Sequence, residues 1–200
     1  MARLRLNVGD LASGASEAVA LGEQRPLLLV NRGIWSDLSC WRPVSSLVKM
    51  DVGSYMSMAL RIAGQASGDL PVGALVLGAG GKILGSAHNT RENDGDPFGH
   101  AEVQAIRLAS IELGSWRLSG CTIVVTLEPC PMCASLIMQS RLDRLIFGAF
   151  SPRTGAAGSV YDLTRDERLG HSVEVIGGVM EAECQRLLRA EFRSIRKRGK

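Results

Sequence analysis

Two short stretches decide the fold and the chemistry of this chain: Gly99-His100-Ala101-Glu102 and, about thirty residues later, Pro129-Cys130-Pro131-Met132-Cys133. One imidazole and two thiolates are soft or borderline ligands, a set that suits zinc and leaves a fourth tetrahedral position for water. Glu102 follows the histidine by two residues, where its carboxylate could move a proton on and off that water. We therefore predict one Zn²⁺ per subunit with a bound catalytic water, held by His100, Cys130 and Cys133, and Glu102 as the catalytic residue.

A purely structural zinc is the alternative for the same residues. A structural site is closed by four protein ligands, whereas this pattern supplies three and places a carboxylate beside them. The catalytic interpretation is therefore favoured. Glu128, two residues before Cys130, is expected to position the neighbouring cysteine loop and not to act in catalysis.

Both stretches are predicted to lie at helix starts. Pro97 and Gly99 precede a run typical of a helix that begins near Ala101, and Pro131 suits the first turn of a second helix. In a first helical turn the Cα–Cβ bonds lean toward the N-terminus, so two side chains there can address one site beyond the helix end. The exposed amides and the dipole of the second helix would favour the two thiolates.

Hydrophobic periodicity outlines the rest of the domain. Apolar residues recur at helical spacing over 52–65, and short apolar runs bounded by turn residues predict strands. Gly78-Ala79-Gly80-Gly81 is interpreted as a hairpin turn and not as a phosphate loop, because no Gly-Lys-Ser/Thr follows. The expected elements are helices over 52–65, 100–113, 131–140 and from about 179 onward, strands over 72–77, 82–87, 121–127, 144–149 and 173–176, and a polar loop over 88–99.

This order of elements predicts an α/β domain with a mixed sheet of about five strands and helices on both faces. Right-handed crossovers would bring the starts of the two metal-bearing helices to the same edge of the sheet. Residues 50–200 contain every recognisable motif and form the predicted domain. Residues 1–49 show no sustained period and are interpreted as an N-terminal extension of unknown role, with translation from Met50 as a further hypothesis.

Composition limits the partners and the compartment. A formal charge of +3 permits an anionic partner without requiring one. Five cysteines, two of them in C-x-x-C, indicate metal binding in a reducing compartment and not a disulfide framework. No run approaches the roughly 18 apolar residues of a membrane span, and no secretion signal is recognisable. We expect a cytoplasmic protein without a membrane partner.

The C-terminal segment is basic. Arg186, Arg189, Arg193, Arg196 and Lys197 fall close to one face of the predicted last helix, and Phe192 lies among them. Such a face can neutralise phosphates, and an aromatic ring can stack on a base. A solvated surface is the simpler alternative for the same charges.

Several further segments give the chain a close resemblance to a known family. The resemblance extends over residues from about 52 to 198, about three quarters of the chain, and rests on Leu70-Pro71-Val72-Gly73-Ala74, Asp96-Pro97, Leu118, Val125-Thr126-Leu127-Glu128-Pro129-Cys130, Met132-Cys133-Ala134, Ser140-Arg141, Phe147-Gly148-Ala149 and Thr154-Gly155-Ala156-Ala157-Gly158-Ser159. The H-x-E…P-C-x-x-C arrangement is a known signature of zinc-dependent base deaminases. The zinc motif and the other segments together make the chain resemble the bacterial tRNA-specific adenosine deaminases.

The resemblance implies a three-layer α/β/α cytidine-deaminase-like fold and a homodimer. It also implies hydrolytic conversion of the wobble adenosine, position 34, of tRNA-Arg to inosine, with the anticodon stem-loop as partner. His100, Cys130 and Cys133 match the family's zinc ligands and Glu102 its proton shuttle, while Asn89 matches an asparagine that binds the flipped purine. Phe192, Arg193 and Arg196 are the predicted RNA contacts on the last helix.

Three residues depart from the family pattern at positions near the site or facing RNA: Phe98, Ser151 and Glu191. Two alternatives therefore stay open. One is a deaminase of free bases or nucleosides of the guanine, cytosine or cytidine type, which would have no use for the basic helix. The other is a non-catalytic RNA-binding protein with a deaminase fold, which would have no use for Glu102.

Overall fold

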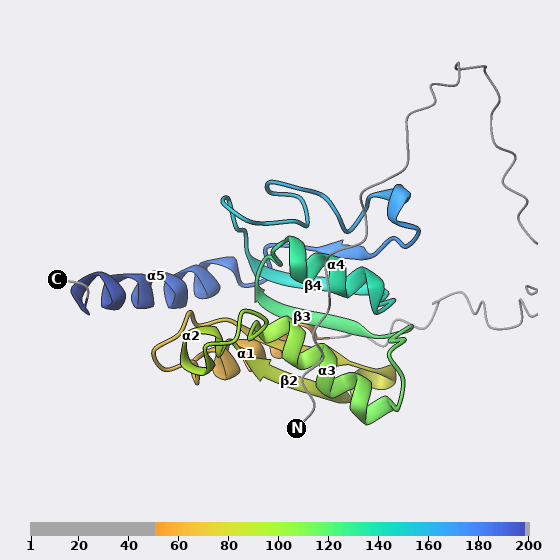
Figure 1. The fold of residues 1–200 in the computed structure, drawn as a ribbon, viewed down its shortest axis with the longest axis horizontal. Helices are drawn as coiled ribbons and strands as arrows, with labels where there is room; N and C mark the ends of the chain where they lie inside the picture. Colours follow the sequence, from red (N-terminus) through yellow and green to blue (C-terminus); the bar gives the residue numbers. More distant parts are fainter. Residues whose placement is uncertain (1–50, 199–200) are drawn as a thin grey trace, which may run out of the picture. The chain divides into compact units, whose positions relative to one another are not determined.

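The computed structural model describes residues 51–198, with side chains described as far as Glu191 (Figure 1). The predicted N-terminal extension and Met50 lie outside the described residues. The elements follow one another as α1 (Val52–Ala63), β1 (Gly73–Leu77), the single turn η2 (Ala79–Gly81), β2 (Ile83–His88), α2 (Arg91–Asp94), α3 (Ala101–Leu113), β3 (Thr122–Leu127), α4 (Pro131–Gln139), β4 (Arg144–Ala149), the single turn η3 (Glu167–Leu169), β5 (Glu174–Ile176) and α5 (Glu181–Arg198). The predicted α/β class is confirmed.

The five strands form one mixed sheet in the order β2-β1-β3-β4-β5. β1 pairs antiparallel with both β2 and β3, whereas β3, β4 and β5 run parallel. β2 and β3 therefore point the same way, because each is antiparallel to the strand between them. Their carboxyl ends meet at one edge of the sheet, and α3 and α4 begin beyond that edge.

Helices cover both faces of the sheet, as predicted. Three strand glycines show which helix lies on which face, because a helix passes close to each of them. A Cβ added to Gly73 would meet the backbone of α1, and a Cβ added to Gly85 would meet the backbone of α3. A Cβ added to Gly148 would meet the side chain of Cys184 in α5. Strand register places Gly148 on the same face as Gly73. α1 and α5 thus share one face, and Figure 1 shows α3 and α4 on the other.

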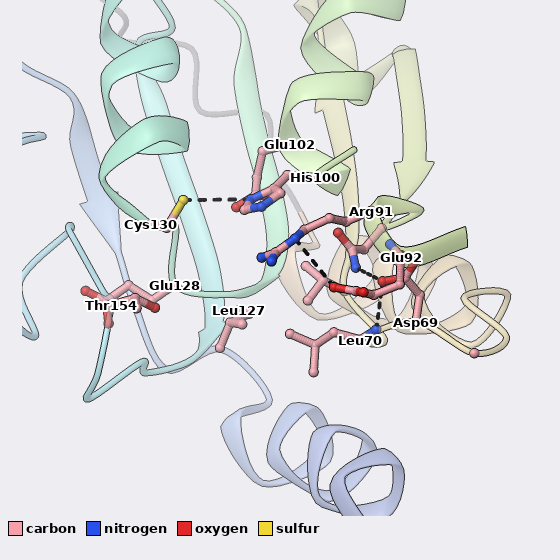
Figure 2. Close-up of a pocket in the computed structure, with 13 residues that line it drawn as sticks. Asp69, Leu70, Arg91, Glu92, His100, Glu102, Leu127, Glu128, Cys130 and Thr154 are labelled. Atoms are coloured by element: carbon pink, nitrogen blue, oxygen red, sulfur yellow. Dashed lines mark hydrogen bonds and ion pairs between the residues drawn. The ribbon is translucent and has the colours of Figure 1, made fainter. Parts of the chain in front are cut away.

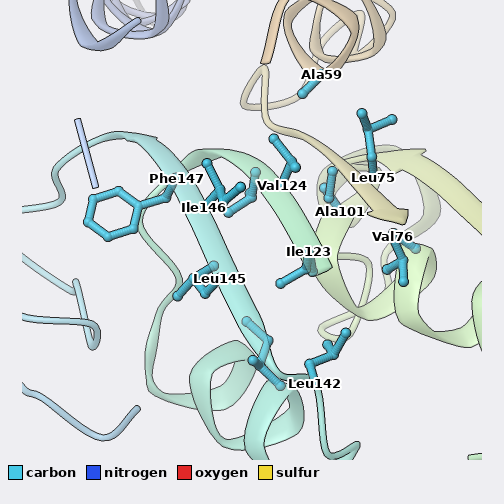
Figure 3. Packing of buried hydrophobic residues seen from close by; sticks show 14 of the residues in the cluster. Ala59, Leu75, Val76, Ala101, Ile123, Val124, Leu142, Leu145, Ile146 and Phe147 are labelled. Atoms are coloured by element: carbon cyan, nitrogen blue, oxygen red, sulfur yellow. The ribbon is translucent and has the colours of Figure 1, made fainter. Parts of the chain in front are cut away.

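The core lies between these layers. Strand residues such as Leu75, Val124 and Phe147 are buried together with the helix residues Ala59 and Ala101 (Figure 3). Alternate strand residues meet helices on opposite faces, which is why the central strands read as continuous apolar runs. α1 presents Met56, Ala59 and Ala63 to the core, which is the periodicity that predicted it.

The expected loop over residues 88–99 is the part of the prediction that is wrong, because it contains the short helix α2. Thr90, its N-cap residue, makes no side-chain capping bond. Instead, one carboxylate oxygen of Asp69 accepts hydrogen bonds from the backbone N–H groups of Glu92, at 2.9 Å, and Asn93, at 3.1 Å. A cap that comes from 23 or 24 residues earlier in the chain leaves no local signal in the sequence.

We expect Gly73→Ala to lower the free energy of unfolding by about 1–3 kcal/mol. A methyl group there would lie 2.6 Å from the backbone nitrogen of Ala63 and closer still to the carbonyl oxygen of Ala59, so α1 would have to move off the sheet. Urea titration measures the effect. Gly53→Ala in α1 is the control: its nearest atom would be Asp51 Oδ1 at 3.5 Å, so stability should hold or rise slightly. Equal losses in both variants would contradict this packing.

Within the described residues, every helix is too short or too polar to cross a bilayer.

Candidate active site and metal centre

The two decisive stretches of the sequence meet in space. His100 is the N-cap residue of α3, Cys130 is the N-cap residue of α4, and Cys133 lies in the first turn of α4. The Nδ1 atom of His100 is 3.7 Å from the sulfur of Cys130 and 3.4 Å from that of Cys133. All three candidate ligand atoms lie within 4.8 Å of one another. The structure thus brings together the three residues predicted to hold a metal.

These distances fit a shared zinc ion. Zinc takes sulfur at about 2.3 Å and nitrogen at about 2.0–2.1 Å in a tetrahedron, which sets neighbouring sulfur and nitrogen ligands about 3.6 Å apart. The observed 3.4 and 3.7 Å bracket that value. Within residues 51–191, no fourth histidine, cysteine or carboxylate completes the group. The donor set therefore fits one catalytic Zn²⁺ per subunit, with a fourth position left for a non-protein ligand.

One of the two cysteines, Cys130, already favours the thiolate form that zinc binds. A hydrogen bond from Cys133 lowers the pKa of the Cys130 thiol to about 4, so Cys130 is ionised at neutral pH. The same hydrogen bond raises the pKa of Cys133, which keeps the shared proton. The pKa of His100 is raised, chiefly by its hydrogen bond to Cys130. A metal binds by displacing such protons.

Glu102 lies in the first turn of α3, beside the metal ligands, and is buried with 5% of its surface exposed. Burial raises the pKa of its carboxyl group. A raised pKa makes the carboxylate a stronger base and brings its titration closer to neutral pH, which suits a general acid–base catalyst. The predicted catalytic residue thus lies where the metal chemistry would need it.

These residues open onto a cavity of ≈ 870 Å³. His100, Glu102 and Cys130 form one part of its wall, and Asn89, the predicted purine-binding residue, forms another. Figure 2 shows Asp69 and Glu92 across the cavity from Cys130 and Glu128. The volume is in the range that holds a small organic ligand, and the wall combines a metal site with polar groups.

Glu128 organises the loop over residues 151–159. Its buried carboxylate accepts hydrogen bonds from the backbone N–H groups of Ser151 at 2.9 Å, Ala157 at 3.1 Å and Ser159 at 3.0 Å, and from the Ser159 hydroxyl. Thr154, which belongs to this loop, lines the cavity (Figure 2). The bonds of Glu128 therefore go to a distant loop and give it a positioning role there.

Gln104 is a supporting residue that sequence reasoning missed. Its side-chain Nε2 donates toward the carbonyl oxygens of His88, at 3.0 Å, and Gly99, at 3.2 Å, and toward Thr90 Oγ1, at 3.2 Å. These contacts fasten the 88–99 segment onto α3 and so fix the backbone that carries His100. The only signal in the sequence is its position four residues after His100, one helical turn along.

The remaining predicted substrate contacts are on α5. The side chains of Phe192, Arg193 and Arg196 lie outside the described residues. On the described part of the same helix, Arg186 pairs with Glu183 at 3.2 Å, and Arg189 donates to Gln185 at 2.7 Å. Two of the basic residues predicted to face RNA thus have neutralising or polar neighbours on their own helix.

Comparison with known proteins places this site among zinc-dependent deaminases. Residues 50–149 match the family model for the cytidine and deoxycytidylate deaminase zinc-binding region. The chain is 45% identical over 148 residues to tRNA-specific adenosine deaminase of Bacillus subtilis, a match that covers 73% of this chain and 91% of that relative. It is also 46% identical over 145 residues to tRNA(Ile)-lysidine synthase of Deinococcus deserti, although it spans only 27% of that relative.

The fold of this chain is also similar to that of a solved deaminase structure. That structure comes from a study of A-to-I editing by tRNA:A34 deaminases at the wobble position of transfer RNA. The TM-score is 0.65 at 34% identity, with 68% of this chain and 99% of that chain covered. The three-layer deaminase fold expected from the sequence is confirmed.

Proposed function

Because the chain belongs to the tRNA-specific adenosine deaminases of the cytidine and deoxycytidylate deaminase superfamily, we propose that it converts the wobble adenosine of an anticodon loop, position 34 of tRNA-Arg, to inosine. The observation that carries this proposal is the convergence of the ligand atoms of His100, Cys130 and Cys133, with His100, Cys130 and the buried Glu102 on the wall of one cavity. Residues 50–200 would form the catalytic domain, with residues 1–49 as an appended segment.

His100, Cys130 and Cys133 would hold the zinc ion. When bound, zinc would act as a Lewis acid and lower the pKa of a water molecule to ~7. Glu102 takes the proton from that water and delivers it to N1 of adenine, and afterwards it passes a proton to the departing amino group. Adenosine and water thereby become inosine and ammonia.

The cavity accounts for how one base could be selected. Its volume of ≈ 870 Å³ is in the range of small-ligand sites and too small for a base-paired helix, so the target base must be unstacked to enter. Anticodon loops already present unstacked bases, which lowers the cost of turning one outward. Asn89, on the wall with Glu102 and His100, would hydrogen-bond the purine.

Contacts beyond the target base are assigned to the last helix and to a second subunit. Phe192, Arg193 and Arg196 would meet the anticodon stem-loop by stacking and by neutralising phosphates. We also propose that the protein acts as a homodimer, as the family resemblance of its sequence implies. A tRNA substrate would place it in the cytoplasm.

The experiment is a substrate panel for the zinc-loaded protein. An anticodon stem-loop with adenosine at the wobble position is compared with the same stem-loop carrying guanosine there, and with free adenosine, guanine, cytosine and cytidine. Inosine in the first RNA alone is the expected result, with ammonia released in equal amount. Deamination of a free base or nucleoside with similar kcat/KM would replace the proposal by the free-substrate alternative. Tight RNA binding without any turnover would replace it by the non-catalytic one.

A further inference from the structure

Asp69 is a buried carboxylate with a complete set of hydrogen-bond donors. Only 1% of its surface is exposed. Its Oδ1 accepts from the backbone N–H of Leu70, at 3.1 Å, and from Nδ2 of Asn89, while Oδ2 accepts from the N–H groups of Glu92 and Asn93. A carboxylate has about four acceptor sites, so these four donors fill Asp69. Its side chain therefore has no free acceptor site for a ligand.

The contact with Asp69 determines which way the Asn89 amide points. An ionised carboxylate only accepts hydrogen bonds, so the Asn89 atom that faces it must be the nitrogen and not the oxygen. The Asn89 backbone is fixed as well, because its N–H donates to the carbonyl of Val72 at 3.0 Å. Both the backbone and the amide plane of Asn89 are thus held by neighbours on the cavity wall.

The other end of the same amide is left for a ligand. Within residues 51–191, no protein group bonds to the Asn89 oxygen. It is not sealed in the interior either, since no buried side-chain oxygen or nitrogen in the described part lacks a partner. Asn89 lines the cavity that also contains Glu102 and His100. Its oxygen and second amide hydrogen therefore meet the contents of the cavity in one fixed order.

We propose that Asp69 is a positioning residue for substrate recognition: by accepting the Asn89 amide hydrogen, it fixes the order of acceptor and donor that Asn89 presents to the base. This rests on the proposed function of Asn89 as a base contact and assigns its orientation to a residue outside the zinc site. An amide at position 69 could pair with Asn89 in either orientation. The fixed order would then be lost while the carbon skeleton stays the same.

The test is a double-mutant cycle on the full-length, zinc-loaded protein, with the anticodon stem-loop as substrate. Asp69→Asn is expected to lower kcat/KM by about 10–100-fold, because a misplaced contact weakens binding and alignment together. In the Asn89→Ala background the same substitution should cost less than about twofold, since Asp69 then has no amide to orient. Binding of the stem-loop by the Glu102→Gln protein, with and without Asp69→Asn, measures the recognition part without turnover.

Asn93→Ala is the matched control for a merely structural role. Asn93 Nδ2 donates to the carbonyl of Ser67 at 2.8 Å, so it joins the same two segments as Asp69 without contacting Asn89. Its loss should lower Tm slightly and leave kcat/KM within about twofold. Equal losses of kcat/KM from Asp69→Asn in the wild-type and Asn89→Ala backgrounds would overturn the proposal. A loss of kcat/KM in Asn93→Ala as large as that in Asp69→Asn would also overturn the proposal.

NMR of the wild-type protein gives a measurement that needs no folded variant. One Nδ2 proton of Asn89 should be shifted downfield and exchange slowly, as expected for a donor to a buried carboxylate. Two amide protons that exchange quickly and resemble those of a solvated asparagine would overturn the proposal. The rate of the wild-type protein on the substrate panel tests the proposed function alone, whereas the cycle and the amide signals test Asp69. Failure of one is therefore distinguishable from failure of the other.

Discussion

Glu102→Gln protein is expected to bind zinc as well as the wild-type protein and to deaminate its substrate about 10²–10⁴-fold more slowly. Glutamine keeps the shape of the side chain but cannot carry a proton between water and base. Burial already disfavours the charged form of Glu102 and raises its pKa, so a neutral replacement should not lower Tm. Zinc content by mass spectrometry, Tm and single-turnover rates measure the three quantities separately.

Glu112→Gln is the matched control for this prediction. Glu112 lies on the same helix, α3, but is exposed and pairs with Lys82 at 2.8 Å on the surface. Exposed ion pairs contribute little to stability, and Glu112 is not among the residues that line the cavity. Its variant should keep full activity. A Glu102→Gln protein that retains wild-type turnover would remove Glu102 from the mechanism.

Cys133→Ala is expected to abolish tight zinc binding and, with it, activity. Cys133 is fully buried, its sulfur lies 3.4 Å from His100 Nδ1, and the described residues offer no substitute donor. Loss of a direct ligand should exceed the roughly 10–100-fold drop in affinity that loss of a supporting contact causes. Competition with a chromogenic chelator measures the affinity, and thermal unfolding with and without added zinc measures its contribution to stability.

Cys121→Ala provides the comparison for Cys133→Ala. Cys121 is also a buried free cysteine, but it lies among core residues and outside the metal group. A modest loss of stability with full zinc content is expected there. If Cys133→Ala binds zinc as tightly as Cys121→Ala does, then Cys133 is not a ligand.

Chain-local signals were sufficient for the centre of the domain. His100, Cys130 and Cys133 were recognisable because metal ligands must be particular residue types, and Pro131 marked the helix start that carries two of them. Strands such as Thr122–Leu127 were recognisable because both faces are covered, which favours a short run of mostly apolar, β-branched residues. The metal-ligand motifs, the helix start and the strands can each be identified from residues that are close together in the sequence.

The supporting contacts were not predictable in the same way, because each joins residues far apart in the chain. No pattern in the sequence singles out Asp69, yet it caps α2 and holds Asn89. The 151–159 loop, around Glu128, is likewise held by bonds across more than twenty residues of sequence. Gly73 is required because the backbone of α1 passes over it. A hydrogen bond or a close backbone contact between residues far apart in the chain produces no repeating pattern in the sequence.

X-ray absorption spectroscopy at the zinc edge of the zinc-loaded protein tests the central claim most directly. A catalytic site built from His100, Cys130 and Cys133 predicts two sulfur ligands at about 2.3 Å, one imidazole nitrogen at about 2.0–2.1 Å, and one further oxygen ligand from solvent. The oxygen should remain in Glu102→Gln protein. A spectrum with four protein ligands, whether a third sulfur or a second imidazole, would contradict the account, because a closed site has no position at which to activate water.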